Sequence, residues 1–156
     1  MTQEEVKAII YEMMAKLTIA FTATDDNLLK YAEAVAATEF EQGYTQVIAA
    51  GLDEMGQLHY DLQCDMPVGQ DSGCAEFFLI ERMRKARKRL TTIVAYRQGV
   101  GVVNPCPSCA ARLLHFFPDV EVIVWGADLR RKVHIRGMVP FVFKKRDPSK
   151  LVNGGH

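Results

Sequence analysis

The chain has 156 residues, of which 49% are hydrophobic and 24% are charged, a balance typical of one globular domain with a single core. Its formal net charge is zero, so no overall field draws it to nucleic acid or to an anionic membrane. No apolar run is long enough to span a bilayer, and the first residues lack the basic-then-apolar pattern of a signal peptide. We therefore predict a cytoplasmic, soluble protein whose partners include neither a nucleic acid polymer nor a membrane. In that compartment the four cysteines favour metal binding or catalysis over disulfides.

Residues 2–17 are predicted to form an amphipathic helix, because Thr2 and Glu5 have capping-box spacing. Its apolar residues recur along one stripe, which consists of Val6, Ile9, Ile10, Met13, Met14 and Leu17. We expect this stripe to pack in the core or against another subunit; a groove for a different partner is the less favoured alternative. Residues 18–24 are predicted to be a linker, and a second helix should run from the helix starters at 24–27 to about Phe40.

The middle of the chain is predicted to begin with a β-hairpin, with strands at 45–52 and 57–64. An irregular loop at 66–73 then leads into a third helix, from Cys74 to about Leu90. The far end of this helix carries six cations: Arg82, Arg84, Lys85, Arg87, Lys88 and Arg89. Cations suit a helix C-terminus and a solvated face, and we favour that interpretation over a phosphate-binding or nucleic-acid-binding patch.

The last third of the chain is predicted to contain a strand at 91–97, a helix from Pro107 to about Phe117, and strands at 121–125 and 132–136. An apolar cluster at 138–143 and a polar tail complete it. Strands that alternate with helices after an initial hairpin predict an α/β fold, in which helices cover both faces of a mixed sheet. We divide the chain into an N-terminal helical extension at 1–24, a main domain at 25–145 and a polar tail at 146–156.

Two short motifs place three thiols and one carboxylate at or near predicted helix starts. They are Cys74-Ala75-Glu76 and Pro105-Cys106-Pro107-Ser108-Cys109. The Cys106-x-x-Cys109 pair alone is compatible with a redox pair, half of a structural zinc site, or two packed thiols. Cys64 could close a structural site of four cysteines, but its distance in sequence from Cys74 does not match a zinc knuckle. We predict instead that Cys64 is a small buried residue on a strand.

An open site of three thiolates is chemically coherent. Cysteines at helix N-termini have lowered pKa values and bind metal as thiolates. Three such ligands can hold Zn²⁺ and leave the fourth position to a water, which the metal makes acidic. Glu76 is then placed to take a proton from that water and to return it to a leaving nitrogen.

The two motifs, in this order, resemble those of the zinc nucleoside deaminases, in particular the three-cysteine branch that includes cytidine deaminases and blasticidin S deaminases. The resemblance covers residues 28–143 approximately. It implies that Cys74, Cys106 and Cys109 bind Zn²⁺, that Glu76 is the catalytic proton shuttle, and that Ala75 contacts the substrate.

The resemblance also implies a fold, a reaction and an assembly. The fold would be a three-layer α/β/α sandwich with a mixed sheet of about five strands, so residues 25–145 would be a zinc deaminase domain. The reaction would be hydrolytic: zinc-bound hydroxide attacks a cytosine nucleoside or a related aminopyrimidine, and ammonia leaves. The protein would be a homo-oligomer, a tetramer or a dimer, with a small molecule as its substrate.

The chain departs from the cytidine deaminase pattern at two places. Gln63 and Asp65 stand where cytidine deaminases carry an Asn-x-Glu that grips the ribose, so the amide is longer and the acid shorter by one methylene. We predict that both bind substrate. Phe77 follows Cys-Ala-Glu where cytidine deaminases often have arginine, which is more like the blasticidin S branch.

These departures leave two alternatives open. The first is a deaminase of a blasticidin S-type nucleoside antibiotic. The second, from another class, is a non-catalytic zinc-binding module in which Cys64 completes the ligand set. A deaminase of polynucleotides is less favoured, because the chain has zero net charge and no basic groove rich in aromatic residues.

Overall fold

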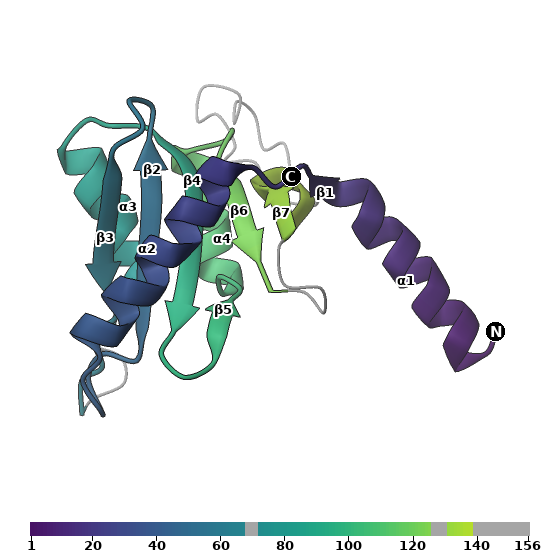
Figure 1. The fold of residues 1–156 in the computed structure, drawn as a ribbon, viewed down its shortest axis with the longest axis horizontal. Coiled ribbons are helices and arrows are strands. Elements are labelled where there is room, and N and C mark those ends of the chain that lie inside the picture. The colour runs from purple at the N-terminus through teal and green to yellow at the C-terminus, as the bar shows by residue number, and fades with distance from the viewer. Residues whose placement is uncertain (68–71, 126–130, 139–156) are drawn as a thin grey trace, which may run out of the picture.

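The computed structural model describes residues 1–67, 72–125 and 131–138 (Figure 1). The described helices are α1 (Gln3–Leu17), α2 (Ala23–Glu39), α3 (Ala75–Lys85), α4 (Pro107–Phe116) and α5 (Ile135–Met138). The described strands are β1 (Thr18–Ile19), β2 (Val47–Asp53), β3 (Leu58–Leu62), β4 (Leu90–Arg97), β5 (Gly101–Val103), β6 (Glu121–Val124) and β7 (Arg131–His134). The expected polar tail lies outside the described residues, as does the apolar cluster beyond Met138.

The described strands form one seven-stranded mixed sheet in the order β1-β7-β6-β4-β2-β3, with β5 paired to β4. β4 and β6 are parallel, and the other pairs are antiparallel. The predicted mixed sheet is confirmed, but the expected five strands are too few. The expected linker at 18–24 is wrong in part, because β1 pairs with β7 through Thr18 opposite Val133. The second additional strand is β5, which pairs with the carboxyl end of β4.

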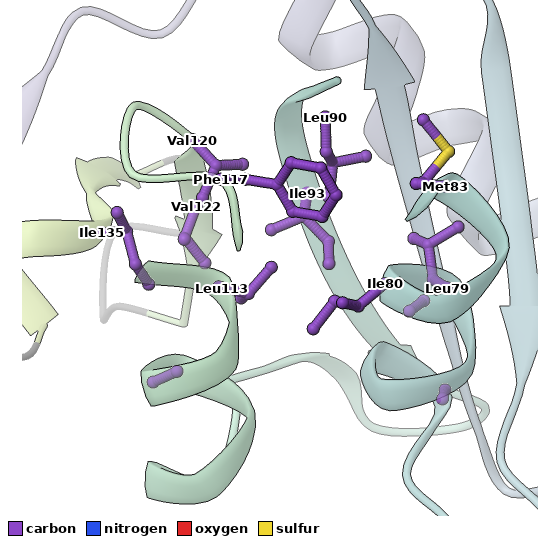
Figure 2. Packing of buried hydrophobic residues seen from close by; sticks show 13 residues of the cluster. Leu79, Ile80, Met83, Leu90, Ile93, Leu113, Phe117, Val120, Val122 and Ile135 are labelled. Carbon is purple, nitrogen blue, oxygen red and sulfur yellow. The ribbon is translucent and has the colours of Figure 1, made fainter. Parts of the chain in front are cut away.

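Helices cover both faces of this sheet, as predicted. Figure 1 shows α2 on one face and α3 and α4 on the other. The core under α2 includes Leu28, Ala32, Ile48, Val94 and Ile123. The core under α3 and α4 includes Leu79, Ile80, Ile93, Leu113 and Phe117, and Figure 2 shows these side chains meeting between the two helices and the strands. Packing on the same face holds α3 and α4 side by side, which determines where their N-termini can meet.

The ends of α2 and α3 differ from the predicted ends for local reasons. α2 begins at Ala23 because Thr22 and Asp25 form a capping box, in which the Asp25 carboxylate accepts the Thr22 N–H at 2.8 Å. α3 ends at Lys85 and not near Leu90, because Arg87 adopts a φ of 55° that cannot continue a right-handed helix. The chain then turns directly into β4.

The predicted N-terminal helix is confirmed as α1, and both hydrogen bonds of its capping box are present. α1 extends away from the sheet (Figure 1). Its apolar stripe is not packed in the core of its own chain, since Ile9, Ile10 and Met13 are 45%, 49% and 59% exposed. Packing of this stripe against another subunit stays a prediction, as does the division of the chain into extension, main domain and tail.

Three of the six cations near the end of α3, namely Arg82, Arg84 and Lys88, are engaged in local pairs. Arg82 pairs with Asp61 at 3.0 Å, and Lys88 lies 3.5 Å from Asp53. Arg84 pairs with Glu81 and stacks over the ring of Phe116. These contacts favour the solvated-face interpretation over a binding patch.

Among the described residues, no helix combines the length and the apolar character that crossing a membrane requires.

Candidate metal centre

The three cysteines of the two motifs converge at one point. Cys74 is the N-cap of α3, Cys106 is the N-cap of α4, and Cys109 lies in the first turn of α4. Their Sγ atoms all lie within 4.8 Å of one another. Two helices that pack on the same face of the sheet thus bring their N-termini, and the thiols there, together.

The local sequence explains why α4 begins where it does. Pro107 occupies the first turn, where its missing N–H costs no hydrogen bond. The Cys109 N–H donates to Cys106 Sγ at 3.4 Å, so the sulfur itself serves as the cap. The predicted start of this helix at Pro107 is confirmed.

The sulfurs influence one another's protonation. Desolvation raises the pKa of the Cys74 thiol, and the neighbouring charge of Cys106 raises it further. Desolvation and the charge of Glu76 hold the pKa of Cys109 well above its usual range. At Cys106 desolvation also opposes ionisation, but hydrogen bonds that begin with the Cys109 N–H outweigh it and lower the pKa. Three thiolates so close together require a cation among them.

The donor set fits zinc. Sulfur ligands of a tetrahedral zinc ion lie about 3.8 Å from one another, given a Zn–S bond of about 2.3 Å. The three Sγ atoms, within 4.8 Å of one another, need only small side-chain movements to reach that spacing. Soft thiolates select zinc over hard cations such as magnesium or calcium.

Glu76 and Ala75 lie directly beside the cluster, in the first turn of α3. Glu76 is only 5% exposed, and burial raises the pKa of its carboxyl group. Glu76 follows the N-cap Cys74 by two residues, and its charge contributes to the raised pKa of the Cys74 and Cys109 thiols. Ala75 is fully buried, at 0% exposure. A carboxyl group that is both close to the sulfurs and reluctant to ionise suits proton transfer.

Cys64 does not join the cluster. In the described part of the chain, the group of side chains arranged so that it could hold a metal ion consists of Cys74, Cys106 and Cys109. The prediction that Cys64 is buried on a strand is wrong, because it is exposed and follows the end of β3. Its backbone exchanges two hydrogen bonds with Gly73, at 3.1 and 2.9 Å, and so closes the base of the loop that leads into Cys74.

Gln63 and Asp65 flank Cys64, at the base of that loop. The Gln63 side-chain carbonyl accepts the Val47 N–H at 3.0 Å, and its amide group donates to Asp65 Oδ1 at 3.1 Å. The structure therefore brings both residues to the sheet edge from which Cys74 departs. Both the oxygen and the nitrogen of the Gln63 side-chain amide are therefore already hydrogen-bonded within the protein.

Arg112, which lies outside both motifs, contacts Ser108 of the second motif and Phe77, the residue after the first. Arg112 donates to Ser108 Oγ at 2.9 Å, and its guanidinium carbon lies 4.8 Å from the centre of the Phe77 ring. Ser108 and Arg112 are four residues apart on α4, a spacing that places them on one helix face. That spacing was the available sequence signal, but the contact with Phe77 depends on the packing of α3 against α4.

Comparison with solved structures shows that cytidine deaminases share this fold. The cytidine deaminase of Mycobacterium tuberculosis superposes with a TM-score of 0.65 at 20% identity, covering 78% of this chain and 98% of that one. The enzyme of Mycobacterium leprae gives 0.63 at 19% identity, covering 74% of this chain and 96% of that one. The enzyme of Bacillus anthracis gives 0.60 at 21% identity, covering 75% and 90% respectively.

The chain thus has the cytidine deaminase fold, which confirms at the level of the fold the resemblance drawn from the cysteine motifs. No protein-family model matches the chain, and no curated protein matches its sequence. Identities near 20% carry the fold alone, so the reaction has to be argued from the residues of the site.

Proposed function

We propose that the protein is a zinc-dependent hydrolase that deaminates a cytosine nucleoside or a related aminopyrimidine and releases ammonia. One observation carries this proposal: three thiols converge with a buried carboxyl group beside them. The set offers three soft ligands and one proton carrier, which is the composition of a catalytic rather than a structural zinc site. The shared fold with cytidine deaminases supports it.

Each residue of the site has a part in this reaction. Cys74, Cys106 and Cys109 would hold the zinc ion. A zinc ion held by these three residues would supply the chemistry of an acidic water, a nucleophile near neutral pH. Glu76 accepts a proton and passes it to the exocyclic nitrogen, so that the nitrogen leaves as ammonia while a carbonyl forms on the ring. The raised pKa of Glu76 helps it to hold the proton between these two transfers.

The test is metal analysis combined with ammonia release over a panel of aminopyrimidines. We expect about one zinc per chain and activity on at least one cytosine derivative. Glu76→Gln should keep its zinc and lose at least 100-fold in kcat, since general acid–base catalysis contributes about 10²- to 10⁴-fold. Glu81→Gln is the matched control, because Glu81 lies on the same helix but pairs with Arg84. A chain without zinc, or a Glu76→Gln variant of unchanged activity, would refute the proposal.

A blasticidin S-type antibiotic is the alternative substrate. The hydrogen bonds that the Gln63 amide makes within the protein support this alternative. Because the Gln63 amide binds Val47 and Asp65, a ribose has to compete with these contacts for it. A site built around hydrogen bonds is sensitive to such competition. Comparing kcat/KM for cytidine and blasticidin S decides between the two substrates.

A non-catalytic zinc module is the alternative from another class. It requires Cys64 as the fourth ligand, whereas Cys64 lies outside the thiol cluster in the described structure. Zinc retention by Cys64→Ser, measured after dialysis against a weak chelator, would argue against this alternative. Loss of the metal in that variant alone would favour it.

We also infer a homo-oligomer, a tetramer or a dimer, in which residues 1–24 act as an extension of a deaminase domain at 25–145. The exposed apolar stripe of α1 supports this inference, because monomers rarely leave such a stripe uncovered. Sedimentation at several protein concentrations tests it, and a monomer throughout the micromolar range would contradict it.

A further inference from the structure

Asn104 lies where two strands meet end to end beside β4. β2 occupies one side of β4 at residues 95–97, so β5, which pairs with the same residues, lies on the other side. β6 lies on that side too, opposite residues 92–94, and runs parallel to β4, whereas β5 runs antiparallel. The carboxyl ends of β5 and β6 therefore point toward each other. The chain leaves the sheet from both ends at this junction, with Asn104 directly after β5 and Trp125 directly after β6.

The Asn104 side chain closes this junction. Its Oδ1 accepts the Trp125 N–H at 2.8 Å. A backbone N–H beyond the end of a strand needs an acceptor from outside the ladder, and here the side-chain amide supplies it. The bond joins segments that are 21 residues apart in sequence, one of which continues directly into Pro105 and Cys106. Asn104 thus ties the second cysteine motif to the end of β6.

Two prolines transmit this attachment to Cys106. A proline fixes its own φ and restricts the residue before it to extended conformations. Pro105 and Pro107 therefore leave little torsional freedom between Asn104 and α4. Cys106 itself is extended, with a φ of −66° and a ψ of 160°, and Pro105 is buried. A bond that holds Asn104 in place consequently also restricts where Cys106 can lie.

A metal site binds more tightly when its ligands are already in place. If a ligand-bearing segment adopts the binding arrangement for only a fraction of the time, the apparent affinity falls by that fraction. Here Cys106 and Cys109 belong to the start of α4, whereas Cys74 belongs to the start of α3. The position of one helix start relative to the other therefore has to be fixed. The bond between Asn104 and Trp125 lies outside both helices and ties the segment before α4 to the sheet.

We propose that Asn104 is a positioning residue for the metal site: by accepting the Trp125 N–H, its side chain holds Cys106 and the start of α4 in the arrangement that binds the metal. The inference rests on the zinc site of the proposed function. It assigns Asn104 a part in the geometry of the thiols and none in the proton transfers.

Zinc affinity, measured by competition with a chromophoric chelator, tests this without any substrate. We expect Asn104→Ala to lower the affinity by about three- to tenfold, the effect of losing one hydrogen bond from the binding arrangement. Asn104→Asp keeps an acceptor oxygen at the same distance from the backbone and should retain most of the affinity. Glu54→Ala is the matched control, because Glu54 also accepts a backbone N–H from a distant segment, that of Arg89 at 2.6 Å, but at the amino end of β4. Its affinity should equal that of the wild type.

Two spectroscopic measurements separate positioning from general stability. The Trp125 amide should exchange its hydrogen faster in Asn104→Ala than in the wild type, and at nearly the wild-type rate in Asn104→Asp. The absorption bands of Co²⁺ bound in place of zinc depend on the geometry of the sulfur ligands. They should change in Asn104→Ala and stay unchanged in Glu54→Ala.

Three outcomes would overturn the inference alone. They are wild-type affinity in Asn104→Ala, equal losses in Asn104→Ala and Glu54→Ala, and equal losses in Asn104→Ala and Asn104→Asp. A wild-type chain that binds no zinc would overturn the proposed function as well.

Discussion

At the scale of single residues, Asp53 is a buried charge outside the metal site. Its Oδ1 accepts the N–H groups of Met55 and Gln57 at 2.8 and 2.9 Å, and its Oδ2 lies 2.8 Å from His59 Nε2. Burial acts to raise its pKa, but these hydrogen bonds outweigh burial and lower the pKa from 3.8 to about 2. The carboxylate thereby fixes the turn between β2 and β3.

Asp53 makes the stability of the protein depend on pH in a defined direction. Its pKa is lower in the folded chain, so its contribution is fully present above about pH 4 and is lost as the pH falls through about 2. The shift corresponds to about 2 kcal/mol. We expect Asp53→Asn to lower the free energy of unfolding at pH 6, measured by urea denaturation, by about that much. Between pH 4 and pH 2 the stability of the variant should fall less steeply than that of the wild type.

A surface acid provides the comparison for Asp53. The side chain of Asp119 is 80% exposed, at 3.9 Å from Arg136, so Asp119→Asn should change the free energy of unfolding by less than about 0.5 kcal/mol. If Asp53→Asn kept the stability of the wild type at pH 6, the hydrogen bonds of its carboxylate would not be what stabilises the turn.

At the scale of secondary-structure elements, a buried ion network joins α2 to the strands β6 and β7 of the sheet. Lys132 of β7 lies 2.9 Å from Asp25 of α2 and also binds Glu121 of β6. Removing only the cation would leave Asp25, which is 2% exposed, buried without its counter-charge. We expect Lys132→Met to reduce the free energy of unfolding by about 3 kcal/mol.

The control for Lys132 is Lys30, whose side chain is 70% exposed and pairs with Asp26 on the surface of α2. Lys30→Met should cost less than about 1 kcal/mol. Equal losses in chemical denaturation of the two variants would show that the network at β7 contributes no more than a surface pair.

The elements also show what a sequence can predict. The capping residues of α1 and the proline that starts α4 act within a few residues, so these two helix starts were predictable. β1 has two residues and β5 has three, too few for an alternating pattern. β1 exists because the distant strand β7 pairs with it, and β5 because the chain folds back onto the end of β4. Gln63 likewise meets Val47 only through the register of β2 and β3. The contact of Arg112 with Phe77 needs two packed helices.

At the scale of the whole molecule, α1 differs from the other helices because it extends away from the sheet and its apolar stripe is exposed. Ion pairs Glu4–Lys7 and Glu12–Lys16 decorate the helix, at 2.9 and 2.8 Å, but they are solvated and contribute little. A helix of 15 residues is only marginally stable in isolation, so packing has to supply most of its stability. The stripe is the surface from which that packing can come.

Replacing the apolar residues of the stripe therefore distinguishes two roles: stabilising the helix's own chain and contacting another subunit. The triple variant Ile9→Ser, Ile10→Ser and Met13→Ser should change the free energy of unfolding of dilute, dissociated protein by less than about 1 kcal/mol, since exposed side chains lose little packing. If another subunit covers the stripe, the same variant should sediment as a smaller species at concentrations where the wild type is assembled. Lys7→Ser with Lys16→Ser tests the charged residues and should leave assembly unchanged. A loss of several kcal/mol in the dilute triple variant would mean that the stripe stabilises its own chain, and unchanged assembly would mean that another surface joins the subunits.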